Sequence, residues 1–318
     1  MYKKAYGIIE TLAPLHVGAT AGEESGNLNL IFRDQFTQTG IIPGSSIRGR
    51  LRSEMRLARQ QWLEAELKNR KEKIPATFTF INAQGQEETR TKLEWLEQKA
   101  KQLKINVPPE KDENIWYGHG AVEGETDSTT ESLLKFEYAS ILWIPVFCPG
   151  QPIVWVSCPK LLQRYKRITG KITTDPQTLL YTSSQKLTAL TVDGAQKLFF
   201  NFGFLTIDHP KQDLSEWFPL GEELPAVVVA DDEIAMIHDM ALYRQSRAAL
   251  YENEKRVKNF FNTEALPEGT ILVFPMAIRE VSNGNGNTNE WKPKHSDIYL
   301  GGLESIGFGH CEITLKGV

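Results

Sequence analysis

Residues 41–52 read IIPGSSIRGRLR, in which a Pro-Gly turn and two serines lead into arginines at every second position, Arg48, Arg50 and Arg52. Pro43 and Gly44 form a turn, and Ser45 or Ser46 predicts the N-cap of a helix. Apolar side chains recur at helical spacing, at Ile47, Leu51, Met55, Ala58 and Trp62. Arginines follow the same spacing one position later, at Arg48, Arg52, Arg56 and Arg59. Because each residue advances about 100° around a helix, the arginine row lies beside the buried row.

The start of this helix is a candidate phosphate site. N–H groups at a helix N-terminus lack partners within the helix, and the helix dipole adds partial positive charge there. Arginine forks match phosphate oxygens, so a sugar-phosphate backbone is a suitable ligand. The residues expected to contact it are Gly44, Ser45, Ser46, Arg48, Arg50, Arg52 and Arg56. A capped amphipathic helix with a solvated arginine face is the alternative, and the missing Gly-Lys-Ser/Thr excludes a Walker A loop.

Composition sets broad limits on what the chain can be. It has 318 residues, 24% of them charged, and a formal net charge of −4, which is ordinary for a globular protein. No apolar run approaches 18 residues and the start lacks a signal-peptide core, so we expect no membrane span and a cytoplasmic location. The three cysteines, Cys148, Cys158 and Cys311, lack metal-ligand spacing and are expected to be free thiols. Positive charge gathers at 48–73 and 160–171, which net charge hides.

Patterns along the rest of the chain indicate an α+β fold. Strands are expected at 6–15, 27–36, 133–147, 197–207 and 270–278. Residues 60–135 are charged, contain a helix candidate at 92–103 and are interpreted as an elaboration of the core. A helix is expected to begin after Asp231 or Asp232, and the aromatic and charged stretch 244–263 fits a protruding arm. Strands interspersed with few helices favour the α+β class.

Two further constellations could bind a ligand. GGLESIGFGH, residues 301–310, places Gly302, Gly307 and Gly309 between two strands, where the backbone can lie against a ligand or simply turn tightly. His16 could act as a base, bind a phosphate or fill a polar site under a turn. The histidines show no zinc-binding spacing, so no metal site is expected from them.

Carboxylates near the second expected strand form another candidate. Glu23, Glu24 and Asp34 could hold a metal ion or orient a 2′-hydroxyl, and solvated loop acids are the alternative.

Together these motifs resemble one family. The order LHVGA (15–19), IPGSSIRGRLR (42–52) and GGLESIGFGH (301–310) resembles the RAMP superfamily of CRISPR proteins. The segments 133–146, 153–167 and 227–237 are similar to the repeating backbone subunit of the Cmr-type (type III-B) effector complex, or to a related III-D subunit.

The resemblance implies a fold and an assembly. It implies a single RAMP domain over 1–318, with a modified RRM-like, ferredoxin-like βαββαβ core, a large insertion at about 60–135 and a protruding thumb at about 244–265. Such subunits polymerise along CRISPR RNA and pair it with target RNA for antiviral defence. The implied partners are neighbouring backbone subunits, a small subunit and a large Cas10-type subunit. The implied guide-binding residues are His16, the helix start at 44–56 and the glycines of 302–309.

The resemblance breaks at the position that carries catalysis. The family segment D-x-P-h-x-R-(D/E) corresponds here to GNLNLIFRD, in which Arg33 and Asp34 match the end and Asn27 or Leu28 takes the catalytic place. An amide cannot act as a base, so this subunit is expected to cut target RNA weakly or not at all. Glu23, Glu24 and Asp34 are the substitute candidates, with Mg²⁺ or Mn²⁺ as the metal. The alternative function is a stand-alone RAMP endoribonuclease that processes repeat RNA with His16 as its base.

Overall fold

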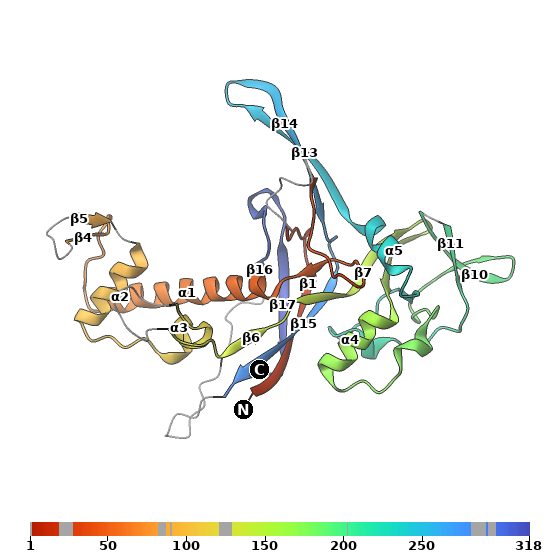
Figure 1. Cartoon of the computed structure of the whole chain (residues 1–318), viewed down its shortest axis with the longest axis horizontal. Coiled ribbons are helices and arrows are strands. Elements are labelled where there is room, and N and C mark those ends of the chain that lie inside the picture. Colours follow the sequence, from red (N-terminus) through yellow and green to blue (C-terminus); the bar gives the residue numbers. More distant parts are fainter. Residues whose placement is uncertain are drawn as a thin grey trace.

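A nine-stranded sheet forms the centre of the molecule, and helices are few, so the fold is mixed α+β (Figure 1). The computed structural model describes residues 2–18, 28–81, 87–89, 91–120, 129–201, 203–280, 291 and 297–318. Glu23, Glu24 and Asn27, all singled out in the sequence, lie outside the described residues. Within the described part, no helix is both long enough and apolar enough to cross a membrane.

The middle of the sheet is built from strands that are distant in sequence. β1 (Tyr2–Thr11) lies between β15 (Ile271–Arg279) and β17 (His310–Lys316) and runs antiparallel to both. β15 also pairs antiparallel with β7 (Ala139–Cys148), and β7 pairs with β8 (Gln151–Ser157). The two ends of the chain therefore meet in one sheet.

Both faces of the sheet are covered. In β7 nearly every residue is buried, as expected for a strand packed on two sides. Ile9, Ile144 and Phe274 belong to one buried cluster, whereas their neighbours Ile8, Trp143 and Val273 belong to a second cluster. Neighbouring strand residues point to opposite faces, so the two clusters are the cores on the two sides of the sheet.

The remaining elements surround this sheet. Its outer strands are β12 (Ala226–Val228) and β16 (Asp297–Tyr299), with β3 (Ile41–Ile42) on β7 and β6 (Leu134–Phe136) on β15. The smaller sheets contain β2 (Leu28–Asn29), β4 (Thr79–Ile81), β5 (Glu87–Thr89), β9 (Leu190–Val192), β10 (Ala195–Phe200), β11 (Gly203–Ile207), β13 (Tyr243–Tyr251) and β14 (Glu254–Ala265). The helices are α1 (Gly44–Asn69), α2 (Lys92–Gln102), α3 (Glu113–Tyr117), α4 (Pro159–Thr169) and α5 (Ile234–Ala241), and short 3₁₀ turns are η1 (Pro109–Lys111), η2 (Pro176–Leu179), η3 (Ser215–Trp217) and η4 (Glu304–Ile306).

Helix α1 begins one residue before the serines expected to cap it. Its N-cap is Pro43, without a side-chain cap bond, and Ser45 and Ser46 lie inside the first turn, so the predicted cap is wrong. The reason is the close approach at Gly44, where a Cβ atom would lie 2.6 Å from the Phe136 carbonyl oxygen. Only glycine fits against this backbone, which fixes the helix start beside β6.

Helix α1 then extends well beyond the sheet (Figure 1). Leu63 and Leu67 are fully buried in its outer half, where they form a small separate core with Leu96 and Ala100 of α2. Residues 60–135 therefore contain the outer half of α1 and the helices packed on it.

Helix α5 also starts without the cap expected from the sequence. Its N-cap is Glu233, with no side-chain cap bond, so the prediction of Asp231 or Asp232 is wrong. The Asp231 carboxylate instead accepts a hydrogen bond of 2.9 Å from the backbone N–H of Lys160, at the start of α4.

Strands β13 and β14 form a long antiparallel hairpin that projects away from the central sheet (Figure 1). The base of β14 pairs in parallel with β2. The pairing is irregular between Ala249 and Tyr251, near the tip. The hairpin covers 243–265, the stretch in which the sequence predicted a protruding arm.

Candidate nucleic-acid interface

The glycine loop and the segment around His16 form one unit, although almost 300 residues separate them. The N–H of Gly302 donates to the His16 carbonyl at 3.0 Å, and the N–H of Gly309 donates to the Pro14 carbonyl at 2.9 Å. At Gly301 the backbone has φ +77°, and a Cβ atom would lie 2.1 Å from the His16 carbonyl oxygen. The glycines therefore allow the loop to lie directly against the segment that carries His16.

The His16 ring is fixed by the base of the hairpin. Its Nδ1 lies 2.7 Å from the Glu264 carbonyl oxygen, and the residue is only 8% exposed. Because a carbonyl can only accept, Nδ1 carries a proton and donates it to Glu264. The position of a Cβ at Gly18 lies 3.2 Å from Nε2, so this nitrogen faces Gly18.

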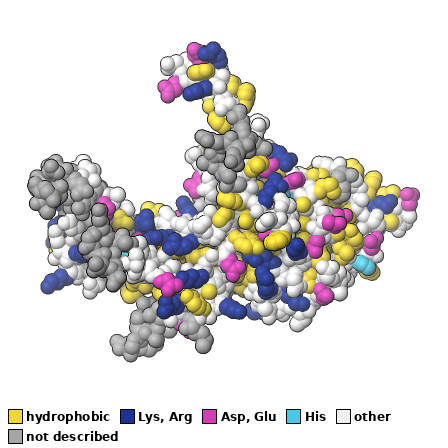
Figure 2. Space-filling view, viewed as in Figure 1, with side chains coloured by type: hydrophobic (Ala, Val, Ile, Leu, Met, Phe, Trp, Pro, Cys, Tyr) yellow, Lys and Arg dark blue, Asp and Glu magenta, His cyan; other side chains and the backbone are white. Residues whose placement is uncertain are grey.

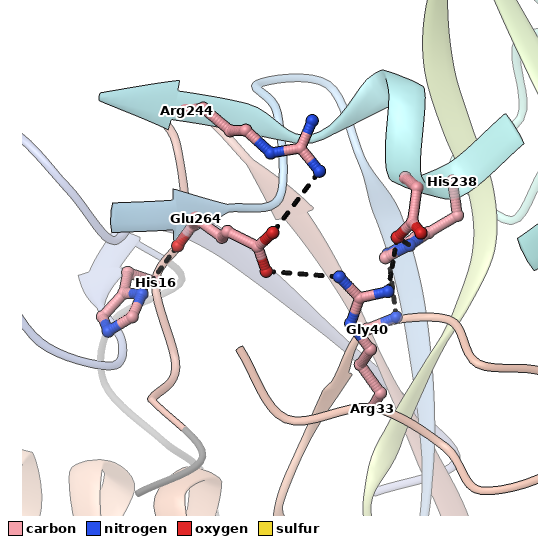
Figure 3. Close-up of polar contacts among 7 residues, drawn as sticks. His16, Arg33, Gly40, His238, Arg244 and Glu264 are labelled. Carbon is pink, nitrogen blue, oxygen red and sulfur yellow. Dashed lines mark hydrogen bonds and ion pairs between the residues drawn. The ribbon is translucent and has the colours of Figure 1, made fainter. Parts of the chain in front are cut away.

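An ion-pair network ties the hairpin base to the 33–40 segment (Figure 3). The Glu264 carboxylate is 5% exposed and accepts from Arg33 at 3.2 Å and from Arg244 at 3.4 Å. Arg33 also pairs with Asp239 of α5. The two partners of Arg33 come from two distant segments, α5 and β14, and no spacing in the sequence reveals them.

His238 lies buried beside this network. Its Nε2 accepts a 2.9 Å hydrogen bond from the N–H of Gly40, which requires Nε2 to be unprotonated. The Asp239 carboxylate lies 3.7 Å from Nδ1, beyond hydrogen-bond distance. Burial lowers the pKa of His238 below 6.5, although Asp239 acts in the opposite direction.

Stability should therefore decline in mild acid through His238. Because its pKa is lower in the folded state, its contribution is present above pH 6.5 and is lost as the pH falls below that value. We expect His238→Gln, whose amide oxygen can accept from Gly40, to be less pH-sensitive than the native chain by up to about 1.4 kcal/mol per pH unit. Urea unfolding at about pH 7.5 and 5.5 measures this difference, and parallel losses in both proteins would contradict it.

The hairpin exposes a mixture of apolar and cationic side chains. Leu250, Tyr251, Val257 and Phe260 are between 40% and 57% exposed. The guanidinium of Arg256 lies 4.8 Å from the centre of the Tyr251 ring. Lys255 and Lys258 are exposed on β14, the strand that also carries Arg256. Aromatic rings among cations are the combination that binds single-stranded nucleic acid, through base stacking and phosphate contacts.

The arginine row of α1 lies against α3 and its flanking residues. Arg52 donates to Asn114 at 3.3 Å, Arg48 donates to the Tyr117 carbonyl, and Arg56 lies 3.6 Å from the Glu113 carboxylate.

Partial burial, with Arg56 and Arg48 nearby, lowers the pKa of Arg52, a sign of crowded positive charge. Arg50 points elsewhere and pairs with Glu54 at 2.6 Å. The predicted row exists, but each member already has a partner, and phosphate binding by it stays a prediction.

Asp34 organises a turn. Its carboxylate accepts hydrogen bonds from the N–H groups of Phe36 and Thr37 and from the Thr37 hydroxyl, at 2.8–3.0 Å. Partial burial opposes ionisation, but these bonds outweigh it and lower the pKa of Asp34. Among the described residues, no group of three or more His, Cys, Asp or Glu side chains could hold a metal ion. The catalytic roles predicted for Glu23, Glu24 and Asp34 stay predictions.

Comparison with known proteins gives a family and a fold. A sequence profile of the RAMP superfamily matches residues 8–312. A chain of the type III-B Cmr-beta complex bound to cognate target RNA is 18% identical with a TM-score of 0.59, and the alignment covers 98% of this chain and 96% of that one. Cmr4 (Cas7) from Pyrococcus furiosus is 17% identical with a TM-score of 0.54, covering 99% and 100%. No curated protein matches the sequence.

Proposed function

The chain belongs to the RAMP superfamily, and from this premise we propose that it is a CRISPR RNA-binding backbone subunit of a type III effector complex. The observation that carries the proposal is the projecting hairpin, with exposed aromatic and cationic side chains over a base fixed to His16 and Arg33. The whole chain is similar in fold to subunits of the Cmr type, including a complex bound to target RNA.

The core is proposed to be a modified ferredoxin-like unit. β1 and β7 both run antiparallel to β15, so they are parallel to each other with β15 inserted between them. β8 and β15 are likewise parallel on either side of β7, and α4 follows β8 in the chain. Two interleaved split β-α-β units are the basis of the ferredoxin-like fold, here with a different strand order.

The guide is proposed to lie where the hairpin meets the glycine loop. Gly302 and Gly309 of the loop donate backbone hydrogen bonds to His16 and Pro14, Gly307 lies between them in the loop, and the hairpin supplies stacking rings above the sheet. Backbone contacts of this kind hold RNA without reading its bases, so guide–target pairing selects the target. The proposed partners are therefore the guide, its target RNA, further copies of this chain and the small and large Cas10-type subunits.

This subunit is proposed to bind target RNA without cutting it. At the position where the resemblance places a catalytic aspartate, the chain has Asn27 or Leu28, and neither can act as a base. If cuts occur, Glu23 or Glu24 with Mg²⁺ or Mn²⁺ is the remaining source. A cytoplasmic location is part of the proposal, supported by the free, buried thiols of Cys148, Cys158 and Cys311.

The chain is expected to co-purify with single-stranded RNA when produced together with a repeat–spacer array and its neighbouring subunits. Native mass spectrometry should show several copies of the chain on one RNA, and ribonuclease treatment should release them. A monomer free of RNA, recovered from cells that contain the array, would contradict the proposal.

The same particle tests the chemistry. With complementary RNA and Mg²⁺, the target should remain intact opposite this subunit. Cuts that vanish in Glu23→Ala/Glu24→Ala would assign these acids a catalytic role. Cleavage of repeat RNA by the isolated chain in EDTA would instead support the endoribonuclease alternative with His16 as its base.

A further inference from the structure

A second candidate ligand site lies beside helix α4, away from the hairpin. The cavity is bounded by the 34–37 turn, by the 138–140 segment and by the exposed face of α4, and we call it the α4 cavity. Its volume is about 560 Å³, within the range of small-ligand sites. None of the features used for the proposed function lies in it apart from Asp34, whose carboxylate is occupied by the turn.

The walls of the α4 cavity combine aromatic rings with cations. Phe36 is 78% exposed, and the Lys160 ammonium lies 5.6 Å from the centre of its ring. On the inner side, the Arg164 guanidinium lies 4.1 Å from the Tyr138 ring and is held by hydrogen bonds to Ser140 and the Tyr138 carbonyl. The inner pair is thus fixed, whereas Phe36 and Lys160 face outward.

The charge of the cavity is not balanced internally. Within the described part of the chain, Lys160 and Arg167 pair with no carboxylate, and both are exposed. The lining acids, Asp34 and Asp231, accept hydrogen bonds from backbone N–H groups instead.

Arg167 also lines an adjoining cavity of about 310 Å³ together with Lys4, Lys135 and Glu137, and Lys135 pairs with Glu131. A band of cations, with carboxylates among them, continues from the α4 cavity toward β1, and on the face shown in Figure 2 Lys and Arg side chains lie over the middle of the molecule with Asp and Glu between them. An extended polyanion could follow this band, whereas an isolated anion would use only one end of it.

We propose that the α4 cavity binds one nucleotide of a single-stranded RNA, with the base against Phe36 and its phosphate on Lys160 and Arg167. An exposed ring suits a base because stacking needs only a flat π-face, and two unpaired cations suit the phosphodiester. An acidic peptide would use the cations but leave Phe36 without a specific partner. The site is a second RNA contact, separate from the hairpin, and does not depend on the guide-binding proposal.

Binding of a short fluorescent oligouridylate to the full chain, followed by anisotropy, tests this proposal. To remove the hairpin contribution, the assay uses a Tyr251→Ala/Phe260→Ala background. Phe36→Ala is expected to weaken binding about tenfold, and Phe36→Leu, which keeps apolar contact without the ring, should weaken it similarly. Lys160→Gln/Arg167→Gln should make the slope of log affinity against log salt less negative by about 1.4.

A matched control and a mapping experiment locate the effect. Phe147 is 66% exposed at the end of β7, and Phe147→Ala should leave affinity unchanged. Ultraviolet cross-linking followed by mass spectrometry should place the oligouridylate on Phe36 or Tyr138. Unchanged affinity in all α4-cavity variants would overturn the proposal. Full competition by polyglutamate, with cross-links elsewhere, would overturn it in favour of an acidic peptide site. The amount of guide RNA that co-purifies with the same variants measures the role of the hairpin in guide binding separately.

Discussion

Replacing Glu113 with alanine is expected to lower the free energy of unfolding by about 3 kcal/mol. Glu113 is 2% exposed and lies 3.0 Å from the guanidinium of Arg59, which is itself 7% exposed. Removing the carboxylate leaves Arg59 buried with Glu97, at 2.7 Å, and the more distant Asp112. A buried charge that loses a partner is costly, because water does not replace the lost interaction. Urea unfolding followed by tryptophan fluorescence measures the loss, since Trp116 is buried on the same short helix.

Two variants separate the buried pair from ordinary surface charge. Glu97→Ala removes the more exposed partner of Arg59 and should cost less than about 1 kcal/mol. Arg59→Met/Glu113→Leu replaces the pair by apolar side chains and should recover most of the stability lost in Glu113→Ala. If Glu113→Ala unfolds at the same urea concentration as the native chain, the carboxylate does not hold the insertion on α1.

The first part of α1, over 47–62, and the arm at 244–263 were predictable because each depends on a local pattern. The helical spacing of apolar residues in 47–62 and the mixture of charged and aromatic residues in 244–263 each lie within one segment. The exact start of α1 was not predictable, since it is set by the contact of Gly44 with the backbone at Phe136. A capping preference of about 1 kcal/mol is overridden by such tertiary contacts.

Ion pairs between residues that are distant in sequence could not be predicted from the sequence. The arginine row was read correctly as one face, but Glu113 lies 54 residues beyond Arg59 and carries no signal of pairing with it. Likewise, Glu264 joins Arg33, Arg244 and His16 because β14 pairs with β13 and β2 and because Leu266 pairs with Leu15. Pairing between distant residues depends on the topology of the chain. A single sequence without periodic repeats carries no local pattern that reveals this topology.

Removing the two exposed rings of the hairpin, in Tyr251→Ala/Phe260→Ala, is expected to weaken single-stranded RNA binding about thirtyfold or more. Tyr251 is 43% and Phe260 57% exposed on an arm that projects from the sheet, so neither ring supports the core. Each stacked base contributes about 1–3 kcal/mol, and two rings together give at least about 2 kcal/mol, or roughly thirtyfold. Anisotropy with the full chain, and the amount of RNA that co-purifies, both measure this loss.

The control is a ring of similar exposure elsewhere. Phe204, which is 61% exposed on β11 at the opposite side of the sheet from α1, should tolerate alanine without loss of RNA (Figure 1). The salt dependence should change little in Tyr251→Ala/Phe260→Ala, because stacking releases no counterions, whereas Lys255→Gln/Lys258→Gln should make it shallower by about 1.4. Native affinity in the aromatic variant would mean that the hairpin does not stack on RNA. In that case the exposed apolar surface of 250–260 would need a protein partner, because solvent alone does not favour it.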